Sequence, residues 1–315
     1  MQNKKKKSRA FKIGHDFRTQ LELKVMLLPA IALILLFDIT PLFGLLMAFK
    51  SFDPIMGIKG IFTSEWNNFQ NFMMIFESFQ FWPMVQNTLG INLLGQLIGI
   101  PVTLLFALLL NEIQHPKFKS FIQTVTYLPH FLSWVIFGGL FITLLNPESG
   151  VVNFLLLQLG LIDKPIPFLA EPGYFWGIAI VTALLKDIGW GAILYLAAMA
   201  GIDQSLHEAA AIDGAGRFKR MLHITIPGIV PTLMILIIFA VSGMLNNNFT
   251  QIFVLQNTLN LPASEVIDTY VYRTGLLNFQ FAQATAIGLM KSVFALALLL
   301  GANTLSKKLT RSGLF

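Results

Sequence analysis

Residues 83–111 read PMVQNTLGINLLGQLIGIPVTLLFALLLN and contain no charged side chain. An α-helix rises about 1.5 Å per residue, so about 20 apolar residues cross a hydrocarbon core of about 30 Å. This stretch is long enough, and five further segments of the chain pass the same test. The six predicted spans are residues 25–49, 83–111, 120–145, 175–200, 227–246 and 282–304. The sequence therefore predicts an all-α integral membrane protein with six transmembrane helices.

The composition of the whole 315-residue chain agrees with this interpretation. Hydrophobic residues make up 55% of it and charged residues 12%, whereas soluble globular chains carry about 25% charge. A soluble enzyme, a disordered chain and a collagen-like chain are thereby excluded. No cysteine is present, which excludes a disulfide framework, a thiol nucleophile and a thiolate metal site.

Lysine and arginine are distributed unevenly between the two sides of the predicted bundle. If both termini are cytoplasmic, the inside segments hold 16 of the 22 lysines and arginines, and the outside loops hold 4. Because cytoplasmic segments are enriched in these residues, we expect the basic tail 1–24, the C-terminus and the loop 201–227 to be cytoplasmic. The tail alone accounts for the net charge of +6, so we expect a contact with membrane lipid and no nucleic-acid partner.

Two shorter apolar runs are expected to lie at the membrane without crossing it. Residues 69–82 mix aromatic side chains with Asn, Gln and Glu, which is typical of a helix at the membrane surface. Residues 151–162 are too short to span and lie between Pro147 and Pro165, which favours an interfacial or re-entrant helix.

The loop 201–227, GIDQSLHEAAAIDGAGRFKRMLHITIP, is the part of the chain that points to a partner. Asp203 or Ser205 can cap a short helix over 205–213, and Gly214 and Gly216 can end it. Its alanines would let another protein's backbone approach closely. Within this loop, Glu-Ala-Ala at 208–210 is followed at fixed spacing by Gly214 and by Ile-Thr-Ile-Pro at 224–227.

This spacing resembles the EAA loop of permease subunits from binding-protein-dependent ABC importers, with Ile226 at a position where that family usually has Leu. Residues 28–54 and 195–216 are similar to the carbohydrate-type branch of the family. Residues 266–276, 286–293 and 302–308 are similar to its subgroup for oligosaccharides and complex glycans. Only the loop pattern is specific on its own.

The resemblance implies a type I ABC importer permease fold over 25–315, in a bacterial cytoplasmic membrane. It implies a second homologous permease, a cytoplasmic ATPase dimer that holds ATP and magnesium, an extracytoplasmic solute-binding protein or lipoprotein, and an oligosaccharide or glycan fragment as solute. It also implies that the helix at 205–213 couples to the ATPase, so that this chain carries no cofactor and no catalytic residue of its own. The residues implied in coupling are Glu208, Ala209, Ala210, Asp213, Gly214, Arg217, Ile224 and Pro227.

Polar residues within the spans are candidates for the solute pathway, because ionisable groups at membrane depth tend to face a cavity or a partner. Lys186 and Asp187 lie near the centre of the fourth span, and Trp190 shares a helix face with Lys186. An aromatic ring beside hydrogen-bonding groups suits a sugar, but a structural polar contact between helices is an equal alternative. For the single charges Asp38 and Lys291 we expect structural roles.

Amides at the outer end of the fifth span are further candidates. Asn246, Asn247 and Asn248 are either the outer mouth of a pathway or a solvated helix end. Polar groups also occur along the second span, at Gln86, Asn87, Asn92 and Gln96, and they predict packing against another helix bundle. The outer loop 248–281 is a candidate contact for a binding protein, through Tyr270, Tyr272 and Arg273, or a lid-like insertion.

No catalytic constellation is found in the sequence. It contains no GxxxxGK[ST] and no GxSxG, and the HE pair at 207–208 is not followed by the second histidine of HExxH. The alternatives that stay open are the same architecture importing a solute other than a sugar, and an ion-coupled carrier that works without an ATPase.

Overall fold

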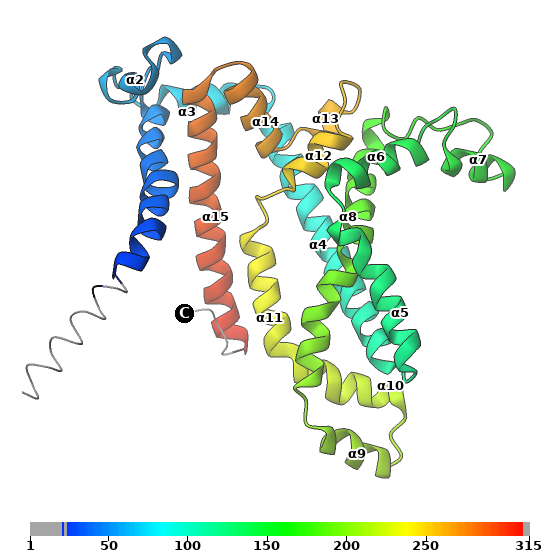
Figure 1. Ribbon diagram of the computed structural model, residues 1–315. Coiled ribbons are helices and arrows are strands. Elements are labelled where there is room, and N and C mark those ends of the chain that lie inside the picture. The colour runs from blue at the N-terminus through cyan, green and yellow to red at the C-terminus, as the bar shows by residue number, and fades with distance from the viewer. Residues whose placement is uncertain (1–20, 22–23, 311–315) are drawn as a thin grey trace, which may run out of the picture.

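The computed structural model describes residue 21 and residues 24–310, and its elements are helices joined by short connections. Five helices are long and apolar enough to cross a bilayer. They are the first helix Lys24–Phe49, α4 Phe81–Glu112, α8 Pro172–Ala200, the helix Arg217–Ser242 and α15 Phe281–Thr310 (Figure 1). The predicted all-α membrane bundle is therefore confirmed. The basic tail 1–24 lies outside the described residues, apart from residues 21 and 24.

The third predicted span, 120–145, is not one continuous helix. Helix α5 (Pro116–Tyr127) runs into a 3-10 turn (Leu128–Phe131), and α6 (Trp134–Leu144) then leaves at 101° to that segment. Pro129 has no N–H to continue the ladder, and the Ser133 hydroxyl oxygen accepts from the Ile136 amide at 3.3 Å to start α6. The segment predicted as the third span is therefore bent, and the break comes from local backbone chemistry that an apolar run does not reveal.

The fifth span begins earlier and ends earlier than the predicted 227–246. Helix α10 (Arg217–Arg220), a π-helical turn (Met221–Thr225) and α11 (Ile226–Ser242) form one continuous segment. The π turn shifts the hydrogen-bond ladder just before Pro227, where an amide donor is missing anyway. The three asparagines at 246–248 therefore follow α11 in an irregular link.

Short helices form a layer at one end of the bundle, the upper end in Figure 1. Helices α3 (Gln70–Glu77) and α7 (Val151–Gln158) have eight residues each, so the prediction that these two runs do not span is confirmed. The predicted loop 248–281 is a chain of helices packed onto the bundle and not a detached lid. The remaining members of the layer are α2 (Gly57–Thr63), α12 (Phe249–Leu255), α13 (Leu261–Ser264), α14 (Ile267–Tyr272) and a π turn (Arg273–Leu277).

The interior contacts of the bundle centre on α4 and α8, which pack along much of their length. One buried cluster joins α4, α8 and α11, and it includes Leu110 of α4, Ala192 of α8 and Ile229 of α11. Gly189 lets α8 approach α5, since a Cβ there would lie 2.3 Å from the carbonyl oxygen of Thr126. Most other large apolar side chains point outward, as a lipid-facing surface requires.

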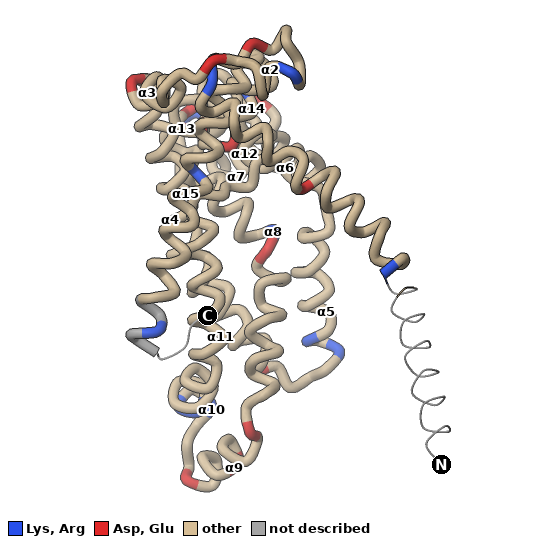
Figure 2. The backbone as a smooth tube through the Cα atoms, turned by 90° about the vertical axis from the view of Figure 1, so that its left-hand side faces the viewer, with Lys and Arg blue, Asp and Glu red and all other residues tan. Residues whose placement is uncertain are grey.

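Helix α9 (Gln204–Ile212) projects from the end of the bundle opposite the layer of short helices (Figures 1 and 2). Figure 2 shows Lys and Arg at the start of α5, on α10 and near the end of α15, all toward the end that carries α9. This distribution is the one that the lysine and arginine count predicts for a cytoplasmic end.

Candidate functional site

The ends of α9 are fixed by its own loop. The Asp203 carboxylate accepts a hydrogen bond from the Ser205 amide at 3.0 Å, and this bond lowers the pKa of Asp203. At the other end the Ala215 amide donates to the Ala210 carbonyl at 2.8 Å, and Gly214 has a φ of +78°. Such a left-handed closing residue is strained for any side chain but glycine. Of the two predicted caps, Asp203 is the one that forms, and of the two predicted glycines Gly214 ends the helix, whereas Gly216 precedes α10.

The surface of α9 is unoccupied within the described chain. Glu208 and Ala209 are exposed, Ile212 is 87% exposed, and Glu208 has no ion-pair partner among the described residues. Leu206 and Phe218 add exposed apolar area around the same loop. An apolar and acidic helix that projects from the bundle is suited to contact another protein.

The stem of the loop is packed tightly onto the bundle. A Cβ on Gly228 would lie 2.9 Å from Ile202, so the segments that enter and leave the loop touch each other. Ile202, Met221 and Ile226 pack against the buried cluster shared by α4, α8 and α11. The stem of the loop is thus in direct contact with these helices. The other residues implied in coupling lie along this path, with Asp213 after α9, Arg217 at the start of α10, Ile224 in the π turn and Pro227 in α11.

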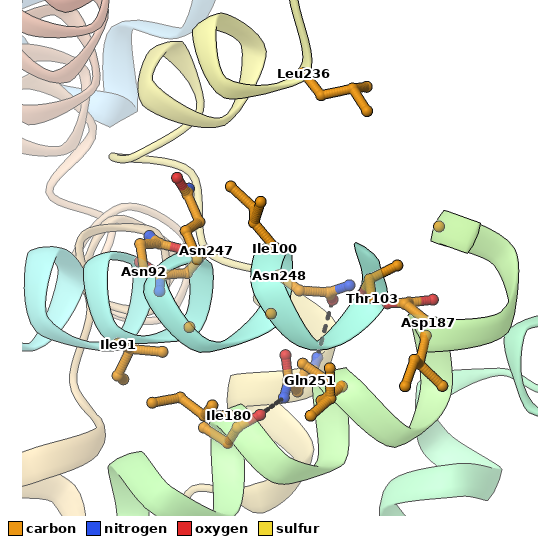
Figure 3. Close-up of a pocket in the computed structure, with 18 of the residues that line it drawn as sticks. Ile91, Asn92, Ile100, Thr103, Ile180, Asp187, Leu236, Asn247, Asn248 and Gln251 are labelled. Atoms are coloured by element: carbon orange, nitrogen blue, oxygen red, sulfur yellow. Dashed lines mark hydrogen bonds between the residues drawn. The ribbon is translucent and has the colours of Figure 1, made fainter. Parts of the chain in front are cut away.

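A cavity of about 380 Å³ opens beside α4, α8, α11 and α12. Figure 3 shows its lining residues around one space, arriving from α4, from α8 and from the link at 246–248. Polar groups are prominent among them, namely Asn92, Gln96, Thr103, Asp187, Asn247, Asn248 and Gln251. The lining is otherwise apolar, which is the usual composition of a small-molecule site.

Asp187 lines this cavity and is held in place from the break in the third span. His130 Nδ1 lies 2.7 Å from the Asp187 carboxylate. The His130 ring stacks on Trp190 with centroids 4.4 Å apart and 3° between the planes. Two of the three residues proposed from the fourth span, Asp187 and Trp190, are thus brought together by a histidine that the sequence did not single out.

Lys186 lies elsewhere. Its side chain is buried, and the ammonium donates to the carbonyls of Pro129, His130 and Leu132 at 2.8, 2.7 and 2.6 Å. Trp134 lies beneath it at 5.5 Å. Lys186 does not line the cavity, so of the two alternatives the structure supports the structural contact. It holds the end of the 3-10 turn in the bent third span.

The asparagine link borders the cavity instead of ending a solvated helix. The Asn248 side chain accepts from the Gln251 amide at 3.1 Å and caps α12. Gln251 in turn donates to the Ala179 carbonyl at 2.6 Å, as the dashed lines of Figure 3 mark. The Asn247 Oδ1 is buried without a hydrogen-bond partner among the described residues. Asn246 faces a second hollow on the other side of the link.

The sequence predicted that two further amides of the cavity would pack against another helix bundle, but both bond within this chain. Asn92 donates to the Met244 carbonyl at 2.9 Å and Gln96 to the Ala240 carbonyl at 2.8 Å. They bind α4 to the end of α11 within this chain, so the described contacts are not those of a second bundle. Asn92, Gln96 and Thr103 are separated by four and then seven residues, and both spacings place side chains on one face of α4.

In the layer of short helices, Arg273 is engaged within the chain. Its guanidinium pairs with the Glu265 carboxylate and stacks on Tyr270 at 5.4 Å. Burial raises the pKa of Glu265, while the Arg273 charge and the Thr269 hydroxyl act in the opposite direction. Tyr272 packs against Phe249 at 5.2 Å and lines the second hollow. The three residues proposed as an outer contact therefore divide between an internal ion pair and a hollow.

Comparison with protein families gives a match over residues 99–311, more than half of the chain, to the family described as "Binding-protein-dependent transport system inner membrane component". Protein LplB of Bacillus subtilis (strain 168) is 39% identical over 293 residues, which cover 93% of this chain and 91% of that one. The polygalacturonan/rhamnogalacturonan transport system permease protein YteP of the same organism is 38% identical, with 93% and 90% covered.

Solved structures give the same picture. A chain of a bacterial ABC transporter involved in the import of the acidic polysaccharide alginate superposes with a TM-score of 0.85 at 37% identity, covering 95% of this chain and 99% of that one. A second structure, of a bacterial alginate ABC transporter in complex with an alginate pentasaccharide-bound periplasmic protein, also superposes with a TM-score of 0.85, at 36% identity. The likeness includes the whole bundle and not only the family-specific loop.

Proposed function

The chain belongs to the family of inner membrane components of binding-protein-dependent transport systems, and from that membership we propose that it forms, with a second permease, the pathway of an ATP-driven importer of oligosaccharides or glycan fragments. The polar cavity beside α4 and α8 is the observation that carries the proposal. Relatives named for polygalacturonan/rhamnogalacturonan transport and for alginate import support a carbohydrate as the solute.

The lining of the cavity is suited to a sugar. A sugar ring has hydroxyl groups around its edge and apolar CH groups on its faces. Asn247 and Asp187 offer acceptors and donors for hydroxyls, and the apolar remainder of the lining offers a surface for the CH groups. The unsatisfied Asn247 Oδ1 is a group for which a ligand hydroxyl would be a suitable partner.

Energy would reach the cavity through α9. We propose that α9 sits in a groove of a cytoplasmic ATPase subunit, with Glu208 as its main polar contact and Ala209 and Ala210 allowing close approach. ATP and magnesium would be held by that ATPase dimer. Closure of the dimer would displace α9, and the packed stem at Gly228 would pass the displacement to α8 and α11 as a rigid-body movement.

The outer layer of short helices is the face we propose for the solute-binding protein. The Arg273 side chain is 33% exposed, so it and Tyr270 would contact the binding protein by their outer edges while the ion pair with Glu265 keeps them in place. This arrangement requires α9 and both termini to be cytoplasmic.

Gly99 provides a direct test of the cavity. It lines the cavity, and a Cβ built on it meets no atom within 4 Å. We expect Gly99→Leu to fill the space and abolish sugar uptake while the subunits still co-purify. The matched control is Gly139→Leu on α6, where a Cβ also meets nothing within 4 Å but the residue is not part of the cavity lining.

Uptake would be measured in vesicles that contain the complete importer, with and without ATP. Equal uptake by wild type and Gly99→Leu would contradict the cavity as the pathway. Uptake by this chain without any ATPase would instead favour the ion-coupled carrier, and uptake of one solute class other than sugars would correct the solute.

A further inference from the structure

A second hollow, of about 760 Å³, lies on the other side of the asparagine link. Its walls are α15, α14, the π turn that follows α14, and Leu45 of the first helix. It shares Asn247 with the cavity described above, so the two spaces are neighbours across a single side chain. The functions proposed above for the coupling loop and for the first cavity do not involve this hollow.

An ion pair lies in the wall of this hollow. Lys291 on α15 pairs with Asp268 on α14, and their side chains are 16% and 24% exposed. Charged groups at membrane depth are costly and mark pathways or partners. If this pair served only to join two helices, protein atoms would be expected to seal it. Both residues instead line the open hollow.

The pair retains most of its hydrogen-bonding capacity. An ammonium has three donors, and a carboxylate has about four acceptor positions. One hydrogen bond joins them. The ammonium therefore keeps unused donors and the carboxylate keeps unused acceptors, side by side in the wall of the hollow. Two adjacent hydroxyls on a ring can donate to the carboxylate and accept from the ammonium. Because the two charges cancel, the wall recognises hydroxyl groups without requiring a charged solute.

An aromatic surface and a polar amide complete the wall. Tyr272 and Phe249 line the hollow with their rings in contact at 5.2 Å. Asn246 and Thr285 add hydrogen-bonding groups. An acyl chain of a lipid would leave all of these polar groups without partners, whereas a sugar ring matches both the aromatic and the polar part.

We propose that this hollow is a second sugar-binding station, where Tyr272 packs against the CH face of a sugar ring and Asp268 and Lys291 hydrogen-bond to its hydroxyls. The proposal rests on the proposed function and extends it. The two spaces adjoin at Asn247. A solute of several linked sugars would therefore occupy both, or pass from the second hollow to the first cavity. Lys291, expected from the sequence to be structural, is then also a ligand.

Gly288 allows this proposal to be tested without disturbing the ion pair. It lines the hollow, and a Cβ there would meet no atom within 4 Å. The matched control is Gly301→Leu, on the same helix, where a Cβ also meets nothing and the hollow is not touched. The wild-type importer and both variants would be placed in vesicles with the companion permease, the ATPase and the binding protein.

The probe is a size-graded mixture of malto-oligosaccharides and oligogalacturonides, and vesicle contents are read by mass spectrometry. We expect Gly288→Leu to lose uptake of the sugars that wild type imports, and Gly301→Leu to retain it. Wild-type uptake through Gly288→Leu would overturn the station while leaving the first cavity as the pathway. Displacement of a bound phospholipid by Gly288→Leu, with sugar uptake unchanged, would also overturn it. No uptake by wild type would contradict the proposed function and the station together.

A charge exchange separates a ligand role from a structural one. The double variant Asp268→Lys with Lys291→Asp keeps an ion pair between α14 and α15 but reverses donor and acceptor toward the ring. We expect the complex to co-purify in wild-type amount and to lose uptake of the probe sugars. Full recovery of uptake by the double variant would show that the pair only joins the helices, and would overturn the assignment of Asp268 and Lys291.

Discussion

The ammonium of Lys186 supports the most unusual backbone feature of the bundle. The carbonyls of Pro129, His130 and Leu132 lie at the end of the 3-10 turn, and this one side chain donates to all three. The sequence could place Lys186 at membrane depth but could not show its partners, since they lie 54 to 57 residues away in the chain. Proximity of that kind is set by the fold.

Replacing this lysine should therefore destabilise the bundle. Lys186→Met keeps an unbranched apolar stem and removes the donors, and each buried carbonyl left without a donor costs about 1–3 kcal/mol. We expect a clear fall in the unfolding temperature of the detergent-purified protein. Lys59→Met is the control, because Lys59 is exposed on α2 and such changes usually stay within about 0.5 kcal/mol. Equal unfolding temperatures for the two variants would refute the role of Lys186.

Glu265 gives the outer layer a pH dependence of known sign. Burial raises the pKa of this carboxyl above its ordinary value of 4.5, so the folded state binds its proton more tightly than the unfolded state does. Its contribution to the free energy of unfolding is therefore greatest below pH 4.5 and falls as the pH rises through the raised pKa.

Glu265→Gln should remove this dependence. The amide cannot ionise, so we expect the unfolding temperature of wild type to fall relative to that of the variant as the pH rises above 4.5. Thermal unfolding of both proteins across this range measures the difference. A difference that does not change with pH would contradict the assignment of the shift to Glu265.

At the scale of the element, α9 is a short helix with two fixed ends and a free surface. Its existence and its bounds follow from the sequence, because capping and glycine signals are local: Asp203 and Gly214 act on residues a few positions away. The bend in the third span could not be predicted from the sequence in this way, because the apolar length of a segment does not show where its backbone hydrogen bonds break. The bounds of the fifth span differ from the predicted 227–246 for the same reason, since the π turn is not visible in an apolar run.

Two glycines at the end of α9 make a matched test of its rigidity. Gly214 has a φ of +78°, whereas Gly216 has a φ of −65° and space for a methyl group. A left-handed conformation costs a side chain about 1–2 kcal/mol. We expect Gly214→Ala to reduce the ATPase activity that loaded binding protein stimulates, and Gly216→Ala to leave it unchanged. Equal stimulation in both variants would mean that the geometry of this turn does not matter for coupling.

At the scale of the whole molecule, the chain has a projecting helix at one end, a layer of short helices at the other, and two polar spaces between them. Residue composition was sufficient to predict the bundle, and loop spacing was sufficient to predict the projecting helix. The cavities were not predictable, because they depend on which amides from distant helices meet. Asn92 and Gln96 on α4 meet the end of α11, about 150 residues later in the sequence.

The two ends must also face opposite sides of the membrane for the importer to work. The chain has no cysteine, so single cysteines report their position without background. Ala209→Cys places a thiol on the exposed surface of α9, and Ser149→Cys places one in the connection between α6 and α7, at the other end of the bundle.

The decisive measurement is site-specific labelling and cross-linking of these two variants in cells that contain the complete importer. We predict that a membrane-impermeant thiol reagent labels Ser149→Cys in intact cells and labels Ala209→Cys only after the cells are opened. We also predict that a short cross-linker joins Ala209→Cys to the ATPase subunit. Labelling of Ala209→Cys from outside intact cells, or its failure to cross-link to the ATPase in an importer that transports, would contradict ATP-driven coupling through α9.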